Sequence, residues 1–225
     1  MKKKVILGIL FFLPVMFLLI MLSSKHYYTP LDVVKTDIQE LGDFKPATDT
    51  MQVVLKGHIS LVMLFDEDPI QHVTEISNVN EKAYKWAKGY KGFQLIFVVP
   101  EEYKESEPII REKIGEYVDL KYWTFVFGSN DDIHKYYQNL KQGFDNDTTF
   151  GLNTHFYIID KELGLRGRKD DEKGMPLYGY DATNISELHK KVVSDLRILF
   201  QEYRDKRSGK FNSDQRRLKE LSDEE

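Results

Sequence analysis

The stretch 58-HISLVMLFDEDPIQHV-73 decides the fold, because it joins a continuous run of apolar residues to an abrupt acidic turn. A short run with no polar alternation is typical of a strand that is buried on both faces, as the central strands of parallel sheets are. The turn Asp66–Pro69 ends the run, and apolar residues then recur at helical spacing from Val73 to Ala87. The stretch therefore predicts a strand, a turn and a helix, which together are the repeating unit of an α/β protein.

The rest of the chain continues this alternation. Further strands are predicted at 93–99, 122–127, 155–160 and 165–168, the last two joined by a tight turn. Helices are predicted between them, one of which begins at the capping sequence Ser129–Asp132, and a final helix runs from about Ser186 to Tyr203. The order β-α-β-α-β-α-β-β-α predicts an open, mixed α/β sheet with helices on both faces.

Composition excludes several kinds of function. The chain has 225 residues, of which 41% are apolar, so it can form one globular domain with appendages. A net charge of -4 argues against non-specific binding of nucleic acid, because there is no broad positive field to release phosphate counterions. The absence of cysteine excludes disulfides, zinc–thiolate sites, iron–sulfur clusters and thiol nucleophiles.

The N-terminal segment 1–24 predicts a membrane anchor. Lys2–Lys4 precede the apolar run Val5–Leu22, which as a helix would reach roughly 27 Å, close to the hydrocarbon thickness of a bilayer. No small-x-small cleavage site follows, which favours a retained transmembrane helix over the alternative of a cleaved signal peptide. The lysines belong on the cytoplasmic side, so the domain is expected on the periplasmic side.

The remaining boundaries follow from composition. Residues 25–52 are polar and predict a tether, residues 53–204 form the α/β domain, and residues 205–225 predict a solvated, charged tail. Arg166, Arg168 and Lys169 follow the predicted hairpin turn and suggest a small, solvated basic cluster. Such a cluster could alternatively meet an acidic partner or lipid headgroups.

Three stretches carry a resemblance to a known family: LVMLFDEDPIQHV (61–73), YWTFVFGSNDDIHKY (122–136) and FYIIDKELGLRGR (156–168). In order and spacing they resemble the Sco/SenC family, membrane-anchored thioredoxin-fold proteins that assemble the copper centre of cytochrome c oxidase. The resemblance implies a thioredoxin-like fold with an N-terminal transmembrane helix. It also implies an accessory role in respiratory oxidase assembly or copper handling, with an oxidase subunit or an assembly factor as partner.

The chain departs from this family at the copper site. The first cysteine of the family's Cys-Pro-x-x-x-Cys turn falls on Asp68, followed by Pro69, and the second falls on His72. The family's distant histidine falls near Leu152, three residues before His155. Because thiolates hold Cu(I) and carry out dithiol exchange, neither activity is expected. The resemblance then implies a redox-inactive protein that is not an enzyme and whose former active-site surface contacts a partner, through Asp66, Glu67, Asp68, Pro69 and His72.

Two alternatives stay open. Asp68 and His72 are four residues apart at a helix start, and with His155 they could hold Cu(II) or Zn(II) as a metallochaperone would. The other alternative is an enzyme of unrecognised type on a thioredoxin scaffold. The sequence contains no Gly-x-Ser-x-Gly elbow, Walker loop or Gly-x-Gly-x-x-Gly motif that would support it.

Overall fold

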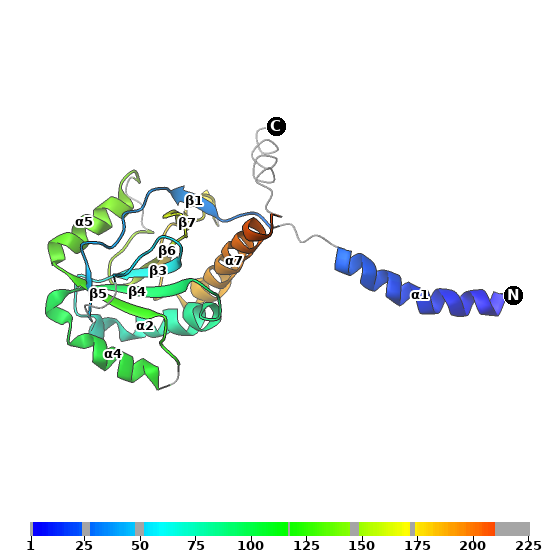
Figure 1. Cartoon of the computed structure of the whole chain (residues 1–225), viewed down its shortest axis with the longest axis horizontal. Helices are drawn as coiled ribbons and strands as arrows, with labels where there is room; N and C mark the ends of the chain where they lie inside the picture. The colour runs from blue at the N-terminus through cyan, green and yellow to red at the C-terminus, as the bar shows by residue number, and fades with distance from the viewer. Residues whose placement is uncertain are drawn as a thin grey trace.

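The computed structural model describes residues 2–23, 28–47, 52–116, 118–144, 149–171 and 174–209, with side chains in the first range from residue 9 to residue 19. Figure 1 shows a central sheet with helices packed on both sides. The strands are β1 (Asp32–Lys35), β2 (Lys45–Pro46), β3 (Ile59–Leu64), β4 (Phe93–Pro100), β5 (Trp123–Gly128), β6 (His155–Ile159), β7 (Leu165–Gly167) and β8 (Tyr180–Asp181). The α-helices are α1 (Lys2–Ser23), α2 (Val73–Val79), α3 (Lys85–Ala87), α4 (Ser106–Gly115), α5 (Asn130–Lys141), α6 (Ile185–Glu187) and α7 (Val193–Ser208).

The sheet has the strand order β1-β7-β6-β3-β4-β5-β2, and β8 also pairs with β6. β3, β4 and β5 are parallel, whereas β6 runs antiparallel to β3 and β7 antiparallel to β6. In the order β4-β3-β6-β7, a helical crossover joins the parallel strands β3 and β4, and a hairpin joins the antiparallel strands β6 and β7. This arrangement makes the domain a thioredoxin-like fold. The predicted mixed α/β class is therefore confirmed.

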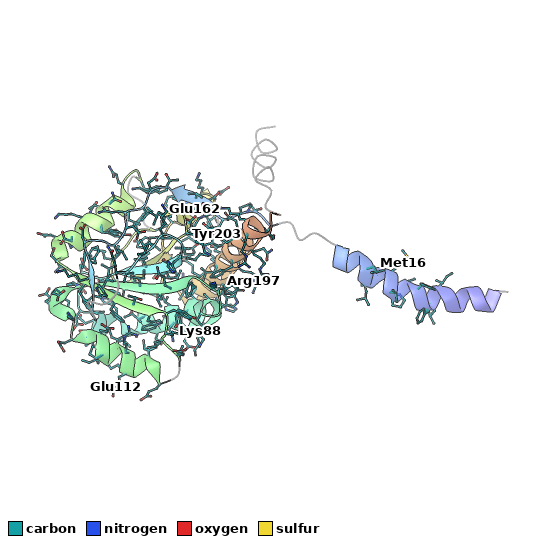
Figure 2. The ribbon with its side chains drawn as sticks, viewed as in Figure 1. Met16, Lys88, Glu112, Glu162, Arg197 and Tyr203 are labelled. Carbon is teal, nitrogen blue, oxygen red and sulfur yellow. The ribbon has the colours of Figure 1, made fainter. Side chains whose placement is uncertain are left out.

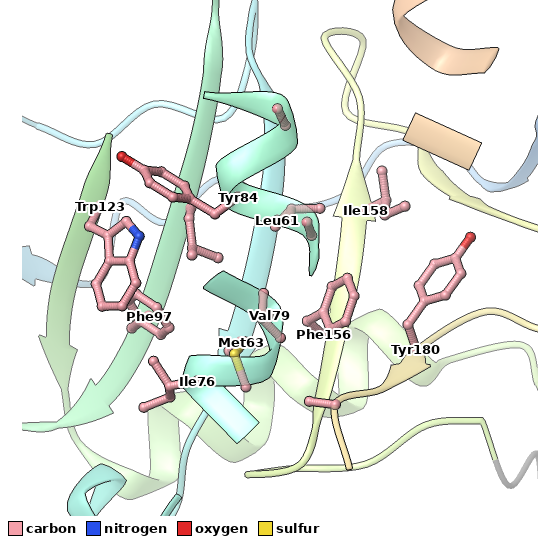
Figure 3. Close-up of a cluster of buried hydrophobic side chains, with 14 of the residues drawn as sticks. Leu61, Met63, Ile76, Val79, Tyr84, Phe97, Trp123, Phe156, Ile158 and Tyr180 are labelled. Carbon is pink, nitrogen blue, oxygen red and sulfur yellow. The ribbon is translucent and has the colours of Figure 1, made fainter. Parts of the chain in front are cut away.

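Two apolar cores lie on opposite faces of the sheet. All six residues of β3 are buried, and they alternate, so that Leu61 and Met63 face one core while Val62 and Leu64 face the other. Figure 3 shows the first core, where Met63 lies close to Ile76 of α2. Helices α4 and α7 complete this core, and α5 covers the second. Helices therefore lie on both faces, as predicted.

Most of the segment predicted as a tether belongs to the folded domain. In the described part of 25–52, β1 pairs with β7 and β2 pairs with β5. Leu31, Ile38, Leu41 and Phe44 are buried, and the last three pack in the second core. A Cβ atom on Gly128 would lie 2.5 Å from the Phe44 ring, so glycine is needed there for this close approach. The tether prediction was wrong because short strands and scattered apolar residues give almost no periodic signal.

The two ends of the chain gave different outcomes. The predicted N-terminal helix is present as α1, and among the residues whose side chains are described no helix is long and apolar enough to cross a membrane. At the other end, α7 continues to Ser208 and ends at Gly209, which adopts a left-handed conformation. Residues 205–208 are thus part of a helix, and the predicted tail from 210 onward lies outside the described residues.

The basic cluster after the hairpin was predicted to be solvated, and this prediction was wrong for Arg166. Arg166 is only 2% exposed, and its guanidinium bonds to Asp160, to Glu202 at 2.9 Å and to the carbonyl of Leu31 at 2.7 Å. Four charge-assisted bonds of Arg166 thus link the β6–β7 hairpin to α7 and to Leu31, the residue before β1.

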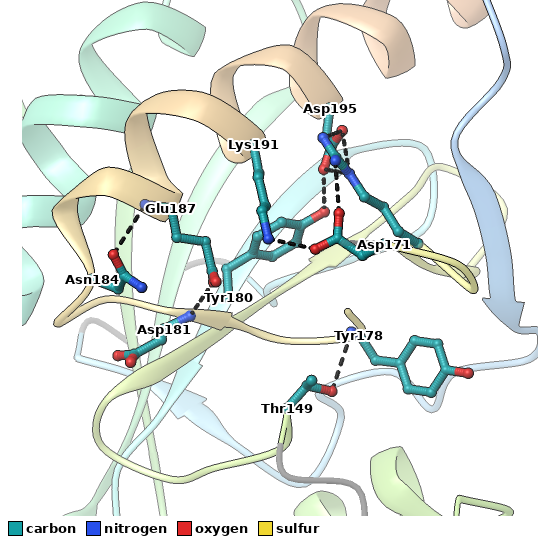
Figure 4. Close-up of polar contacts among 10 residues, drawn as sticks. Thr149, Asp171, Tyr178, Tyr180, Asp181, Asn184, Glu187, Lys191 and Asp195 are labelled. Carbon is teal, nitrogen blue, oxygen red and sulfur yellow. Dashed lines mark hydrogen bonds and ion pairs between the residues drawn. The ribbon is translucent and has the colours of Figure 1, made fainter. Parts of the chain in front are cut away.

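Arg168 lies beside a second polar network. Its guanidinium bonds to Asp195 at 2.8 Å and to Asp171 at 2.9 Å. The hydroxyl of Tyr180 donates to Asp195 at 2.7 Å, and Lys191 pairs with Asp171, as Figure 4 shows. These contacts join Arg168, Asp171 and Tyr180 to the helical segment 188–208. Of the three basic residues, Lys169 alone is exposed.

Candidate functional site

The turn after β3 is held by Asp68. This carboxylate is the N-cap of a 3-10 turn, Pro69–His72, in which Pro69 is buried. Its Oδ1 accepts a hydrogen bond from the backbone N–H of Ile70 at 3.0 Å and another from the hydroxyl of Ser106 at 2.8 Å. Asp68 thus serves the local turn and its packing against the start of α4.

His72 lies at the end of this turn, with 16% of its side chain exposed. Its Nε2 lies 3.4 Å from Oε2 of Glu67, and its ring lies against Phe65 with centroids 5.9 Å apart. The contacts of His72 therefore go to Glu67 and Phe65, whereas those of Asp68 go to Ile70 and Ser106. Glu67 is 59% exposed and is the most accessible of the residues predicted to contact a partner.

Asp66 is bound to a loop that is distant in sequence. Its backbone N–H donates to Oδ1 of Asn153 at 3.0 Å, and Nδ2 of Asn153 donates back to Oδ1 of Asp66 at 2.6 Å. The backbone N–H of Asn153 also donates to the carbonyl of Leu64 at 2.8 Å. On its other side, Asp66 lies 3.5 Å from Nε2 of His134. These hydrogen bonds hold the loop before β6 against the end of β3.

His155 is engaged within its own strand region. Its Nδ1 lies 3.0 Å from the hydroxyl of Thr154, and its backbone pairs with Asp181 of β8. Burial lowers the pKa of His155, and the nearby charge of Asp181 only partly opposes this. This direction favours the neutral form of the imidazole.

The predicted metal set is not brought together. Within the described ranges, no group of three His, Cys, Asp or Glu side chains is placed to hold a metal ion. The physical reason is that Asp68 caps a turn, His72 faces Glu67 and Phe65, and His155 is bonded to Thr154. The side chains of this region as they stand do not fit a copper or zinc ion.

The carboxyl end of the parallel strands presents a group of carboxylates, which we call the acidic rim. It comprises six of the acidic residues that follow β3, β4 and β5: Asp66, Glu67, Glu101, Glu102, Asp131 and Asp132. The loops are linked in space, because Nδ2 of Asn130 lies 3.4 Å from Oε1 of Glu102 and His134, one turn further along α5, faces Asp66. Glu67, Glu101, Glu102 and Asp131 are exposed.

Sequence reasoning did not identify Asn153, His134 or the contributions of the second and third strands to this rim. Asn153 adopts a positive φ of 64°, which asparagine tolerates better than most residues. The signal that could have identified Asn153 is its place next to Leu152, near which the family's distant histidine falls. The carboxylates after β4 and β5 were visible in the sequence, and the rule that parallel strands end at the same edge of a sheet could have grouped them.

Strand order and composition together define the class of this protein: a thioredoxin-like domain in a chain without cysteine. No family model matches the chain, and no curated protein matches it. Among solved structures, similar chains include BsSco, described as a member of the Sco family of cytochrome c oxidase assembly proteins, at 14% identity and a TM-score of 0.48, covering 77% of this chain and 98% of that one.

Two other solved structures illustrate the range. A putative protein disulfide isomerase from Bacteroides thetaiotaomicron has 16% identity and a TM-score of 0.46, covering 77% of this chain and 96% of its own. Copper-bound ScoI from Arabidopsis thaliana has 14% identity and a TM-score of 0.41, covering 70% and 98%. Similarity at this level assigns no function, and the fold class rests on the strand order itself.

Proposed function

We propose that this chain is a membrane-anchored, redox-inactive thioredoxin-like protein that works by binding a partner through its acidic rim. The observation that carries the proposal is the state of the turn after β3. Asp68 caps this turn, Asp66 is bonded to Asn153 and lies 3.5 Å from His134, and no thiol is present to react. The exposed groups there are mostly carboxylates, of which Glu101 pairs with Lys104 and Asp132 with Lys135. A surface of this kind suits contact with a partner better than catalysis.

The absence of thiol–disulfide exchange follows from the composition. Thiol–disulfide exchange requires a thiolate that attacks a disulfide sulfur, and the chain contains no cysteine. The former redox position is filled by residues that stabilise the fold. Incubation of the full chain with insulin and dithiothreitol should not accelerate insulin reduction, whereas thioredoxin should in the same assay.

Two observations support the membrane anchor. Residues 9–19 of α1 are exposed and apolar around the whole helix apart from Pro14; Leu10, for example, is 72% exposed and Phe12 64%. A helix that is apolar on all sides is typical of a membrane span, and the apolar run Val5–Leu22 extends in the sequence beyond these residues. In Figure 1, α1 stands apart from the sheet domain.

The orientation proposed for this anchor places Lys2–Lys4 in the cytoplasm and the domain on the periplasmic side. Carbonate extraction of membranes that contain the full chain should leave it in the pellet. Protease added to spheroplasts should remove the domain, and protease added to inverted vesicles should spare it. The opposite protection pattern would overturn the orientation, and release by carbonate would overturn the anchor.

The partner proposed is a subunit of a respiratory oxidase or one of its assembly factors, with a basic face that complements the rim. The three resembling stretches direct the proposal to this class, and the charge of the rim supports a basic partner surface. Purification of the full chain from detergent-solubilised membranes should recover such a protein. Repeated recovery of the chain alone would overturn this part of the proposal.

A further inference from the structure

A pocket with a volume of about 480 Å³ lies at the opposite end of the strands from the acidic rim. Its walls come from the turn before β4, from the β6–β7 turn and from the last turns of α7, and residues that line it include Tyr90, Lys91, Lys161, Tyr203, Arg204 and Arg207. This volume is within the range of pockets that hold small ligands. Neither the sequence analysis nor the function proposed for the acidic rim gives these residues a role.

Basic side chains and aromatic rings line this pocket. Tyr90 and Phe200 stack with ring centroids 4.0 Å apart, and Nζ of Lys161 lies 5.3 Å from the centroid of Tyr203. Lys206 pairs with Glu162, the acidic residue of the lining, at 3.5 Å. Within the part of the chain that the structure describes, the other four cations of the lining, Lys91, Lys161, Arg204 and Arg207, form no ion pair. The pocket therefore favours an anion, and its aromatic rings suit an amphipathic one.

The connection to α1 limits how far this pocket can lie from the N-terminal helix. The hydroxyl of Tyr28 donates to Asp205 at 2.8 Å, and Asp205 lies between Arg204 and Lys206 of the lining. Helix α1 ends at Ser23, and the five residue steps to Tyr28 can span at most about 18 Å. Figure 2 shows Tyr203 and Glu162 on the side of the domain from which the chain leads to α1.

We propose that this pocket binds the phosphate-bearing headgroup of an anionic membrane lipid and so sets the orientation of the domain on the bilayer. This inference rests on the membrane anchor proposed above. Once Ser23 is at the interface, the cations of the pocket lie within reach of the lipid headgroups, where each Lys or Arg interacts favourably with an anionic surface. Because the rim is at the other end of the strands, lipid binding turns the rim away from the bilayer and toward a partner.

The test uses the full chain in nanodiscs, either of phosphatidylcholine alone or with one quarter phosphatidylglycerol. Because the chain has no cysteine, Ser208→Cys provides one labelling site beside the pocket. Energy transfer from a dye at this position to a headgroup-labelled lipid reports the docked domain. Docking should be stronger in the anionic nanodiscs and should weaken in high salt.

Arg204→Gln combined with Arg207→Gln should remove most of the lipid-dependent signal, because each arginine is expected to raise the affinity for the anionic surface about fivefold. The matched control combines Lys113→Gln with Lys135→Gln, two exposed cations on α4 and α5, and should leave the signal unchanged. Far-UV circular dichroism checks that both variants fold. Equal docking in the two nanodisc compositions, or an equal effect of the control, would overturn the proposal.

Two further outcomes separate the possible causes of a failure. If inorganic phosphate alone, at the concentration of phosphate in the lipid, prevents docking, then the pocket binds free phosphate and the lipid assignment is wrong. If the chain does not remain in nanodiscs of either composition, then the membrane anchor fails and the lipid pocket fails with it. Stable insertion in both compositions without lipid-dependent docking overturns the pocket alone.

Discussion

The two ends of the parallel strands differ in charge and in how their side chains are used. At the carboxyl end, Asp66 is bonded to the loop before β6 and Asp68 to the start of α4, and the exposed groups are mostly carboxylates. At the other end, the side chains of Lys161 and Arg204 line a pocket next to the point where Tyr28 is fixed to α7. The two ends of the strands therefore carry opposite charge, and this difference is the basis of the two roles proposed for them.

The largest expected effect is on the stability of the fold, through the buried ion pairs of Arg166. Arg166→Met leaves Asp160 and Glu202 buried without their shared cation, and should lower the free energy of unfolding by about 3–5 kcal/mol. Urea denaturation measures this. Arg197→Met removes an exposed arginine of α7 that lies over Trp86, and should cost less than about 1 kcal/mol. Equal losses in the two variants would show that the Arg166 network does not hold the hairpin to α7.

The second effect concerns the carboxyl end. Asn153→Ala removes both bonds to Asp66 and places alanine at a positive φ, so it should cost about 2–3 kcal/mol. Asn153→Gly removes the same bonds but tolerates the backbone conformation, and should cost about 1–2 kcal/mol. Thermal unfolding of the two variants separates the contributions. If Asn153→Gly is as stable as the unaltered chain, then the amide does not fasten the loop.

The difference between the two ends also explains what could be predicted from the sequence. The five central strands and the cap at Ser129 were predicted because unbroken apolar runs and capping residues are local signals. The burial of Arg166 could not be predicted, because its partners Asp160 and Glu202 come from a turn and a helix that only the fold brings together. The same holds for Asn153 and Asp66, which are 87 residues apart. The strand β2 has two residues and no pattern to detect.

A smaller effect is expected on the pH dependence of stability. Because burial lowers the pKa of His155, the unfolded chain takes up a proton at this residue at a higher pH than the folded chain does. The contribution of His155 to stability is therefore complete above about pH 6.5 and is lost as the pH falls through the folded pKa. His155→Gln should reduce the loss of unfolding free energy between pH 7.5 and pH 5.0.

The exposed His189→Gln is the matched control for this measurement. Its profile should follow that of the unaltered chain. A variant at His155 whose profile also follows the unaltered chain would show that burial of the imidazole does not affect stability in this range.

The smallest effect is expected on metal binding. Because Asp68, His72 and His155 are engaged by other groups, calorimetric titration of the full chain with Cu(II) or Zn(II) should give the same isotherm for the unaltered chain and for His72→Ala. A site lost specifically in His72→Ala and in His155→Ala would instead establish the metallochaperone alternative.

The central claim, that the domain acts by contact through its acidic rim, is tested most directly by co-purification with rim variants. Glu67→Lys combined with Asp131→Lys reverses two exposed charges of the rim, whereas Glu112→Lys combined with Glu116→Lys reverses two exposed charges at the end of α4. The full-length proteins are purified in parallel from solubilised membranes, and the yield of co-purified oxidase subunit or assembly factor is measured. We expect the rim variant to lose this partner and the α4 variant to retain it; retention of the partner by both would contradict the claim.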